Sequence, residues 1–329
     1  MFYKDTRIRL IKKHFINLLV FLLSLICCFV ITEIVMRVLF KNTLALAMWY
    51  DERNLLYRYD IKLGWFPVEN SYSLFTGSRS IEVEHNSRGF RDSEHIVRAN
   101  PRIVFLGDSF VWGYDVEKQE RFTEKLAAKF ANLSIYNLGV SGYGTDQEYL
   151  LLKQHYDYYK PHIVFLIFSN DEEDNCTNDR YGYFKPYFIA NGDHLTLQGV
   201  PVPKSWHYFL SQHEILSNSF WFRLLTKLYF NFIDPPSLTL HDPTNMIITN
   251  MHRFVKTRGS KFIVGLQGEH SALKKHLEDN RIPHIDLTIP YTFPQKGKHW
   301  TPDGHTFVNE QIFNYLMKEK YLEEVSVTK

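Results

Sequence analysis

From residue 100 onward, short runs of apolar residues alternate with longer stretches in which apolar residues recur every three or four positions. Apolar runs of about four to eight residues are typical of buried strands, and the longer periodic stretches are typical of amphipathic helices. We expect strands at 103–106, 133–138, 161–168, 261–265 and 284–287, and helices at 117–131, 147–159 and 271–279. This alternation predicts an α/β fold with a parallel sheet between two layers of helices.

The amino-terminal forty residues follow another pattern. A basic stretch over residues 4–13 precedes an uncharged apolar run from Phe15 to Thr32, and the apolar character resumes after Glu33 as far as Phe40. This length is about the minimum for a membrane-spanning helix, and no small-x-small cleavage site follows it. We therefore expect a cytoplasmic tail over 1–14 and a transmembrane signal anchor over 15–40. The alternative is the buried core helix of a soluble intracellular protein.

The positions of charged residues around this run predict its orientation. Because basic residues lie before the span, the amino terminus is expected in the cytoplasm and the rest of the chain outside it, in the periplasm or at the cell surface. Glu33 and Arg37 are four residues apart and are expected to pair on one helix face near the far interface.

Two further segments differ from the alternating region. Residues 41–99 read as an ordered lead-in with short strands, and the main domain is expected over 100–325. Residues 176–240 interrupt that domain. We expect an insertion here, with a hairpin around Asn191–Gly192 and helices that carry the aromatic residues from Trp206 to Phe222. A lid over the sheet edge, a small core of its own and contact with lipid headgroups are all compatible with these aromatics.

Composition narrows the possible functions. The formal net charge of the 329 residues is +2, so no general basic field indicates nucleic-acid binding. The three cysteines form neither a disulfide framework nor a zinc-binding spacing. No metal constellation stands out, and no cofactor is expected.

Candidate chemistry follows the ends of the predicted strands. Ser109 comes directly after the first strand, Gly139–Gly144 after the second and Asn170 after the third. The carboxyl ends of parallel strands meet at one edge of the sheet, where α/β proteins bind ligands. A serine nucleophile needs a base and oxyanion donors, and backbone N–H groups at glycines and an asparagine amide are suitable donors. His299 and His305, before the last helix, are the candidate bases.

These motifs resemble those of SGNH (GDSL-type) hydrolases, and more narrowly the bacterial membrane-anchored branch. The first block matches Gly107–Ser109, the second Asn137–Gly142, the third Phe168–Asp171 and the fifth Lys296–His299. The resemblance implies a three-layer, flavodoxin-like sandwich. It also implies that Ser109 is the nucleophile, Gly142 and Asn170 are oxyanion donors and His299 is the base.

Two positions depart from the family pattern. Phe168 stands where the third block usually has glycine, and Lys296 stands where the fifth block has the triad aspartate. A lysine there lowers the pKa of the histidine by like-charge repulsion. Three explanations follow: a Ser109–His299 dyad, a carboxylate supplied by Asp286 or Asp303, or a catalytically weak site. We favour the first two. Asp108, Asp171 and His305 are given structural roles.

The resemblance implies a membrane-tethered, extracytoplasmic serine esterase or O-acyltransferase. Its expected substrates are acetyl or short acyl esters of glycans or lipids. The protein is expected to associate with the membrane through one helix and not to bind nucleic acid. The alternative is a protein of the same fold that binds glycan or assists envelope polysaccharide assembly without turnover.

Overall fold

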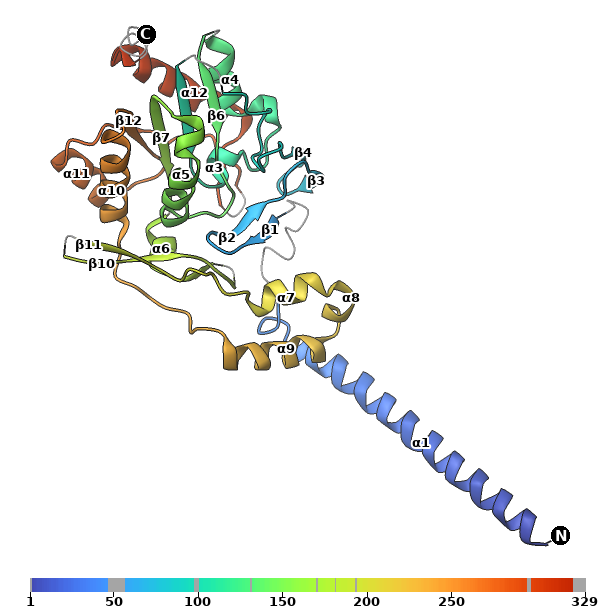
Figure 1. Cartoon of the computed structure of the whole chain (residues 1–329). Coiled ribbons are helices and arrows are strands. Elements are labelled where there is room, and N and C mark those ends of the chain that lie inside the picture. The colour runs from blue at the N-terminus through green and yellow to red at the C-terminus, as the bar shows by residue number, and fades with distance from the viewer. Residues whose placement is uncertain are drawn as a thin grey trace. The chain divides into compact units, whose positions relative to one another are not determined.

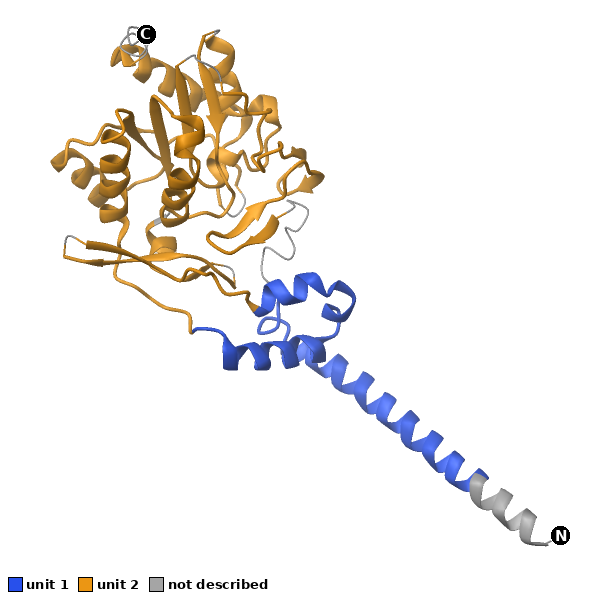
Figure 2. Cartoon of the chain, viewed as in Figure 1, with its two compact units in different colours: residues 1–47, 206–235 blue, residues 48–205, 236–329 orange. Residues whose placement is uncertain are grey.

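A computed structural model describes residues 2–46, 57–97, 101–130, 132–169, 171–180, 182–192, 194–294 and 297–321. It divides into two compact units, which are described separately (Figure 2). Unit 1 comprises residues 1–47 and 206–235, and unit 2 comprises residues 48–205 and 236–329. This division cuts across the predicted 176–240 insertion. Residues 206–235 group with the amino-terminal helix, and Phe220 packs against Met36 near the end of that helix.

Unit 2 contains one five-stranded sheet in the order β13-β12-β7-β5-β6, with every neighbouring pair parallel (Figure 1). In chain order its strands are β5 (Arg102–Leu106), β6 (Ser134–Asn137), β7 (Ile163–Phe168), β12 (Lys261–Leu266) and β13 (His284–Asp286). All five were expected from the sequence, within a few residues at each end. Numbered along the chain the order is 2-1-3-4-5, which is the flavodoxin-like arrangement. The predicted fold class is confirmed.

Side chains alternate across this sheet and build a separate core on each face. Val104 and Leu106 contribute to one cluster, together with apolar residues of α5 (Thr145–Tyr159) and α10 (Thr244–Lys256). Ile103 and Phe105 contribute to the other, together with α4 (Phe122–Lys129) and α12 (Pro302–Lys318). Because successive strand residues point to opposite faces, a strand buried on both sides must be apolar throughout, as β5 and β7 are.

The helices near the sheet depart from the expected bounds in two places. The helix expected over 117–131 is a 3-10 turn, η2 (Lys118–Glu120), followed by α4, because Arg121 has an extended backbone and is fully buried between them. The cap of α5 is Gly144, and not the following Thr145 or Asp146, although residues of these two types often cap helices. Asp146 is the second residue of the helix, and its carboxylate pairs with the buried Lys185. The helix α11 (Ser271–Asp279) has the predicted bounds.

The remaining elements of unit 2 are short. The lead-in forms two antiparallel pairs, β1 (Tyr57–Asp60) with β2 (Gly64–Pro67) and β3 (Tyr72–Thr76) with β4 (Ser80–Glu84). The predicted hairpin around Asn191–Gly192 is confirmed as β10 (Tyr187–Asn191) and β11 (His194–Gln198). The others are α3 (Ser109–Trp112), α6 (Asp171–Asn175), β8 (Asp179–Arg180) and β9 (Tyr183–Phe184).

Unit 1 is helical. It contains α1 (Phe2–Leu39), α7 (Trp206–Gln212), α8 (Glu214–Ser217) and α9 (Phe220–Ile233). Within the described residues, one helix is long and apolar enough to span a membrane, Lys12–Leu39. None of its apolar window is buried within the described chain, whereas the core helix of a soluble domain would be mostly buried. The predicted pair is present, with Arg37 Nη2 2.9 Å from Glu33 Oε1.

Candidate active site

The first residue of α3, Ser109, lies at the point where the strand order reverses. Strand β5 has β6 on one side and β7 on the other, so the chain leaves β5 at the switch point of the sheet. Ligands of open α/β sheets bind at this point. Asp108 caps α3 by accepting a hydrogen bond from the Phe110 backbone N–H at 2.9 Å, and it also accepts one from Ser169 Oγ at 2.9 Å. Its predicted structural role therefore corresponds to joining the ends of β5 and β7.

His299 lies against Ser109, although 190 residues separate the two in the chain. The distance from His299 Nε2 to Ser109 Oγ is 2.8 Å. The imidazole stacks on the Tyr114 ring, with the centroids 4.2 Å apart and the planes 23° apart. A Cβ on Gly297 would lie 2.6 Å from His299 Cε1, and its φ of +92° also favours glycine. The loop thus leaves room for the imidazole and directs one nitrogen toward the serine.

Within the described part of the chain, no hydrogen bond joins the His299 ring to a carboxylate. Asp286 is exposed at the end of β13, where its Oδ1 accepts from the Thr288 backbone N–H at 2.8 Å. Asp303 is exposed in the first turn of α12. The structure brings neither of them into hydrogen-bond contact with His299. Lys296 lies outside the described residues.

The environment of His299 disfavours its protonated form. Burial, and secondarily the positive charge of Arg180, lower the pKa of His299 to about 4. A base with a low pKa remains neutral, and therefore able to accept the serine proton, in moderately acidic solution. The same low pKa makes it a weaker base than an imidazole paired with a carboxylate.

The pKa of His299 predicts the pH dependence of activity. Turnover of a water-soluble ester, expressed as kcat/KM, should stay nearly constant from about pH 8 down to about pH 5, and should fall only as His299 becomes protonated near pH 4. The measurement is a pH profile of p-nitrophenyl acetate hydrolysis by the full-length chain. A midpoint near about 6.5, the ordinary pKa of histidine, would contradict this environment for His299.

The donors proposed for the oxyanion are partly described. Within the described residues, the backbone N–H groups of Ser109 and Gly142 donate no hydrogen bond, so both remain available to a ligand. Gly142 has a φ of +83°, which side chains rarely allow. Asn170, the predicted side-chain donor, lies outside the described residues, as does the side chain of Asp171.

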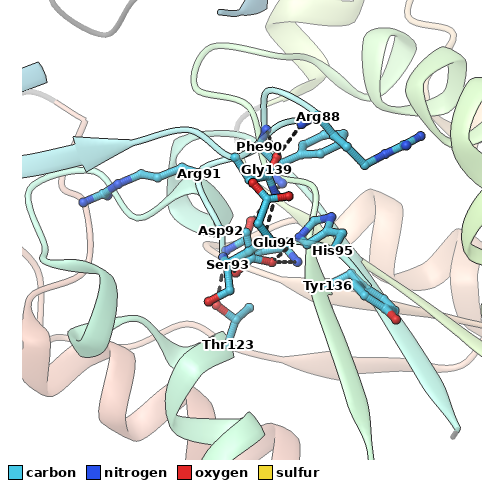
Figure 3. A network of polar contacts seen from close by, with 12 residues as sticks. Arg88, Phe90, Arg91, Asp92, Ser93, Glu94, His95, Thr123, Tyr136 and Gly139 are labelled. Carbon is cyan, nitrogen blue, oxygen red and sulfur yellow. Dashed lines mark hydrogen bonds and ion pairs between the residues drawn. The ribbon is translucent and has the colours of Figure 1, made fainter. Parts of the chain in front are cut away.

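A polar network that the sequence analysis missed supports the second-block loop (Figure 3). The carboxylate of Asp92, in the lead-in, accepts from the Asn137 backbone N–H at 2.8 Å and contacts His95 Nε2 at 2.6 Å. The Asn137 side chain accepts from the Gly139 N–H at 3.0 Å and donates to the Val111 carbonyl at 2.7 Å. Asn137 therefore connects the lead-in, the glycine loop and α3. In the sequence, the Asp-x-x-His spacing of Asp92 and His95, just before the first strand of the sheet, could have indicated this network.

The close approach of this loop to α3 explains one of its glycines. A Cβ on Gly139 would lie 2.4 Å from the Trp112 backbone nitrogen and 2.7 Å from the Val111 carbonyl carbon. Backbone atoms cannot move aside as a side chain end can. Glycine at this position therefore permits the contact between the loop and the helix that carries Ser109.

Two ion pairs involve the segment that follows β7, and one of them joins this segment to α5. Lys185 Nζ donates to Asp146 Oδ2, and both side chains are fully buried. Arg180 donates to Asp174, whose pKa burial raises to about 6. Arg180 also acts electrostatically on the pKa values of His299 and Asp108. The sequence analysis predicted neither pair, and the partners Asp146 and Lys185 come from different elements.

The other motif residues have packing roles. Phe168, which replaces the family glycine, is fully buried, and its ring meets that of His270 edge-on with centroids 4.9 Å apart. His305 is buried as well. It stacks on Phe122, and its Nδ1 lies 3.2 Å from the Phe122 backbone nitrogen, consistent with the structural role expected for it.

Known proteins with a similar fold provide a comparison for this site. No family model and no curated protein matches the sequence. Solved structures with a similar fold include lipolytic proteins of the G-D-S-L family and esterases. A Veillonella parvula member of the lipolytic G-D-S-L family is 12% identical, with a TM-score of 0.39, and the match covers 66% of this chain and 98% of that one. For a psychrotrophic Pseudoalteromonas esterase inhibited by monoethylphosphonate, the identity is 10%, the coverage 67% and 98%, and the TM-score 0.39.

A third similar structure is a two-domain esterase that is active on acetylated mannans. It is 11% identical, with a TM-score of 0.39, and the match covers 68% of this chain and 50% of that esterase.

Proposed function

We propose that this chain is a membrane-anchored serine esterase or O-acyltransferase that acts on acetyl or short acyl esters of glycans or lipids. The observation that carries the proposal is the 2.8 Å contact between His299 Nε2 and Ser109 Oγ at the switch point of the sheet. The motifs shared with SGNH hydrolases support the substrate class.

The proposed reaction has two steps. Ser109 Oγ attacks the ester carbonyl while His299 Nε2 takes its proton, and the N–H groups of Ser109 and Gly142, with the Asn170 amide, stabilise the oxyanion. Collapse expels the alcohol, which receives the proton from His299, and leaves an acyl group on Ser109. Water, or a hydroxyl of a second molecule, then attacks this acyl-serine while His299 takes its proton; the acyl–Oγ bond breaks and Ser109 Oγ regains the proton from His299. Water makes the protein a hydrolase, and a sugar hydroxyl makes it a transferase.

We favour a dyad as the working site. The Tyr114 ring, stacked at 4.2 Å, and the Phe110 ring, 5.4 Å from the imidazole between centroids, restrict the orientation of His299. In a triad a carboxylate both orients the histidine and stabilises its cation. Stacking on these rings orients the imidazole, but it stabilises the imidazolium cation less than a carboxylate would. We therefore expect slower turnover than a complete triad would give.

The proposed location rests on α1. Its apolar window is entirely exposed, and the basic residues Lys12 and Lys13 lie directly before the apolar run. These features support a single span with the amino terminus in the cytoplasm and unit 2 outside it, in the periplasm or at the cell surface.

A second candidate function is glycan binding without turnover. The observation in its favour is that, among the described residues, His299 has no carboxylate partner. It predicts saccharide binding that survives Ser109→Ala, together with no hydrolysis of any acetylated substrate.

Labelling with a fluorophosphonate probe tests the esterase proposal. The probe phosphonylates an activated serine through loss of fluoride, so the folded wild-type chain should be labelled at Ser109, while Ser109→Ala should remain unlabelled. Peptide mapping of the adduct identifies the modified serine. Equal labelling of both proteins, or no labelling of folded wild type, would contradict the proposal. Ser73→Ala, a serine on β3, is the matched control.

A further inference from the structure

The carboxylate of Glu33, near the end of α1, binds the first turn of α9. Glu33 Oε1 accepts from the Phe220 backbone N–H at 2.8 Å, and Oε2 accepts from the Trp221 N–H at 3.2 Å and from Ser219 Oγ at 3.1 Å. The first N–H groups of a helix have no partner within it, and the helix dipole favours a negative charge there. Glu33 thus satisfies groups that would otherwise need water.

Further contacts join α9 to the same end of α1. Arg37, paired with Glu33, donates to the Asn218 carbonyl at 2.6 Å, and Trp221 Nε1 donates to Thr32 Oγ1 at 3.0 Å. Met36 packs with Phe220 in an apolar cluster. The end of α1 is therefore a structural part of unit 1. Cleavage after residue 33 would remove the carboxylate that caps α9.

The outer face of α9 carries an exposed apolar stripe. Its members are Leu225 (60% exposed), Leu228 (46%), Tyr229 (63%), Phe232 (89%) and Ile233 (57%). They recur every three or four residues and so lie on one side of the helix. Phe220, Thr226 and Phe230 are the buried residues of α9. The stripe contains no charge, whereas Arg223 and Lys227 donate to the carbonyls of Leu44 and Thr43, just after α1.

We propose that α9 is an interfacial membrane helix whose stripe inserts into the lipid surface at the point where α1 leaves the bilayer. The occupant is lipid because the stripe belongs to the same compact unit as α1, whose long apolar window is itself unburied. An amphipathic helix of this kind lies along the membrane with its apolar face at the headgroup boundary. The proposal rests on the membrane anchor of the proposed function and is independent of the chemistry at Ser109.

Site-specific fluorescence tests this placement. The full-length chain, with Cys27, Cys28 and Cys176 changed to serine, receives one cysteine at Phe232→Cys or Leu225→Cys and is labelled with nitrobenzoxadiazole. It is reconstituted into vesicles of phosphatidylethanolamine and phosphatidylglycerol. Asn231→Cys is the matched control, because Asn231 is exposed and adjacent to Phe232 but lies off the stripe.

Lipids with a nitroxide near the carbonyl end of an acyl chain should quench labels at 225 and 232 at least about threefold more than the label at 231, and iodide in the water should show the reverse order. Equal lipid quenching at 231 and 232 would overturn the proposal. So would protection of 232 that disappears on dilution of the protein in lipid, since a second copy would then cover the stripe. Fluorophosphonate labelling and carbonate extraction of the same vesicles report separately on Ser109 and on α1.

Discussion

Ser109→Ala and His299→Ala are each expected to lower kcat/KM for an acetyl ester by about a thousandfold or more, and the double variant is expected to lose no more than either alone. The reason is the 2.8 Å contact between the two side chains. Serine without a base is a weak nucleophile, and the base without serine has no proton to transfer, so the two act as one unit. Steady-state hydrolysis of p-nitrophenyl acetate measures all three variants.

Two controls define this experiment. Ser73→Ala and His284→Ala alter a serine and a histidine on other strands and should leave turnover unchanged. Additive losses in the double variant would mean that Ser109 and His299 act independently. A loss in Asp286→Asn or Asp303→Asn comparable with that of His299→Ala would mean that a carboxylate reaches the imidazole in the working enzyme.

Asp146→Ala is expected to destabilise unit 2 by about 3–5 kcal/mol. The side chains of Asp146 and Lys185 are both fully buried, so removal of the carboxylate would leave a buried ammonium without its counter-charge. The Gln147 backbone N–H would also lose its contact with Asp146 Oδ1, at 2.7 Å. The measurement is the urea midpoint of the full-length chain in detergent, followed by near-ultraviolet circular dichroism.

A second pair provides the contrast. Lys129 Nζ lies 2.7 Å from Glu310 Oε1, but those side chains are 28% and 50% exposed, and Lys129→Ala should cost less than about 1 kcal/mol. The double variant Asp146→Leu/Lys185→Met should recover much of the stability lost in Asp146→Ala, because it removes both charges. Equal effects for the buried and exposed pairs would refute the argument from desolvation.

Local pattern was enough to predict the elements whose burial is uniform. β5, β7 and β12 are apolar at nearly every position, which reports burial on both faces without knowledge of the neighbours. The hairpin at Asn191–Gly192 follows from turn chemistry, which is also local. The helix α10 was missed, although Ile247, Ile248, Met251 and Val255 have helical spacing, because it directly follows the irregular insertion.

Residues that act through distant partners were not predictable in this way. Asp92 and Asp146 read as ordinary turn and cap residues, and their partners Asn137 and Lys185 come from other elements. The division of the predicted 176–240 insertion between the two units was also not predictable, because it depends on contacts between residues far apart in the chain. Phe220 read as part of a lid, of an independent core or of a contact with lipid headgroups, and in the structure it packs against Met36 of α1.

The sequence by itself determined the alternation of strands and helices, the long apolar helix near the amino terminus and the four motifs that contain Ser109, Gly142, Asn170 and His299. These features depend on which residues are neighbours along the chain. Only the tertiary structure decided the sheet order that places Ser109 at the switch point, the contact of His299 with the serine and the stacking on Tyr114 in place of a visible carboxylate. These contacts join residues far apart in the chain, and they form only when the sheet and its helices pack, because burial and long-range geometry select the partners.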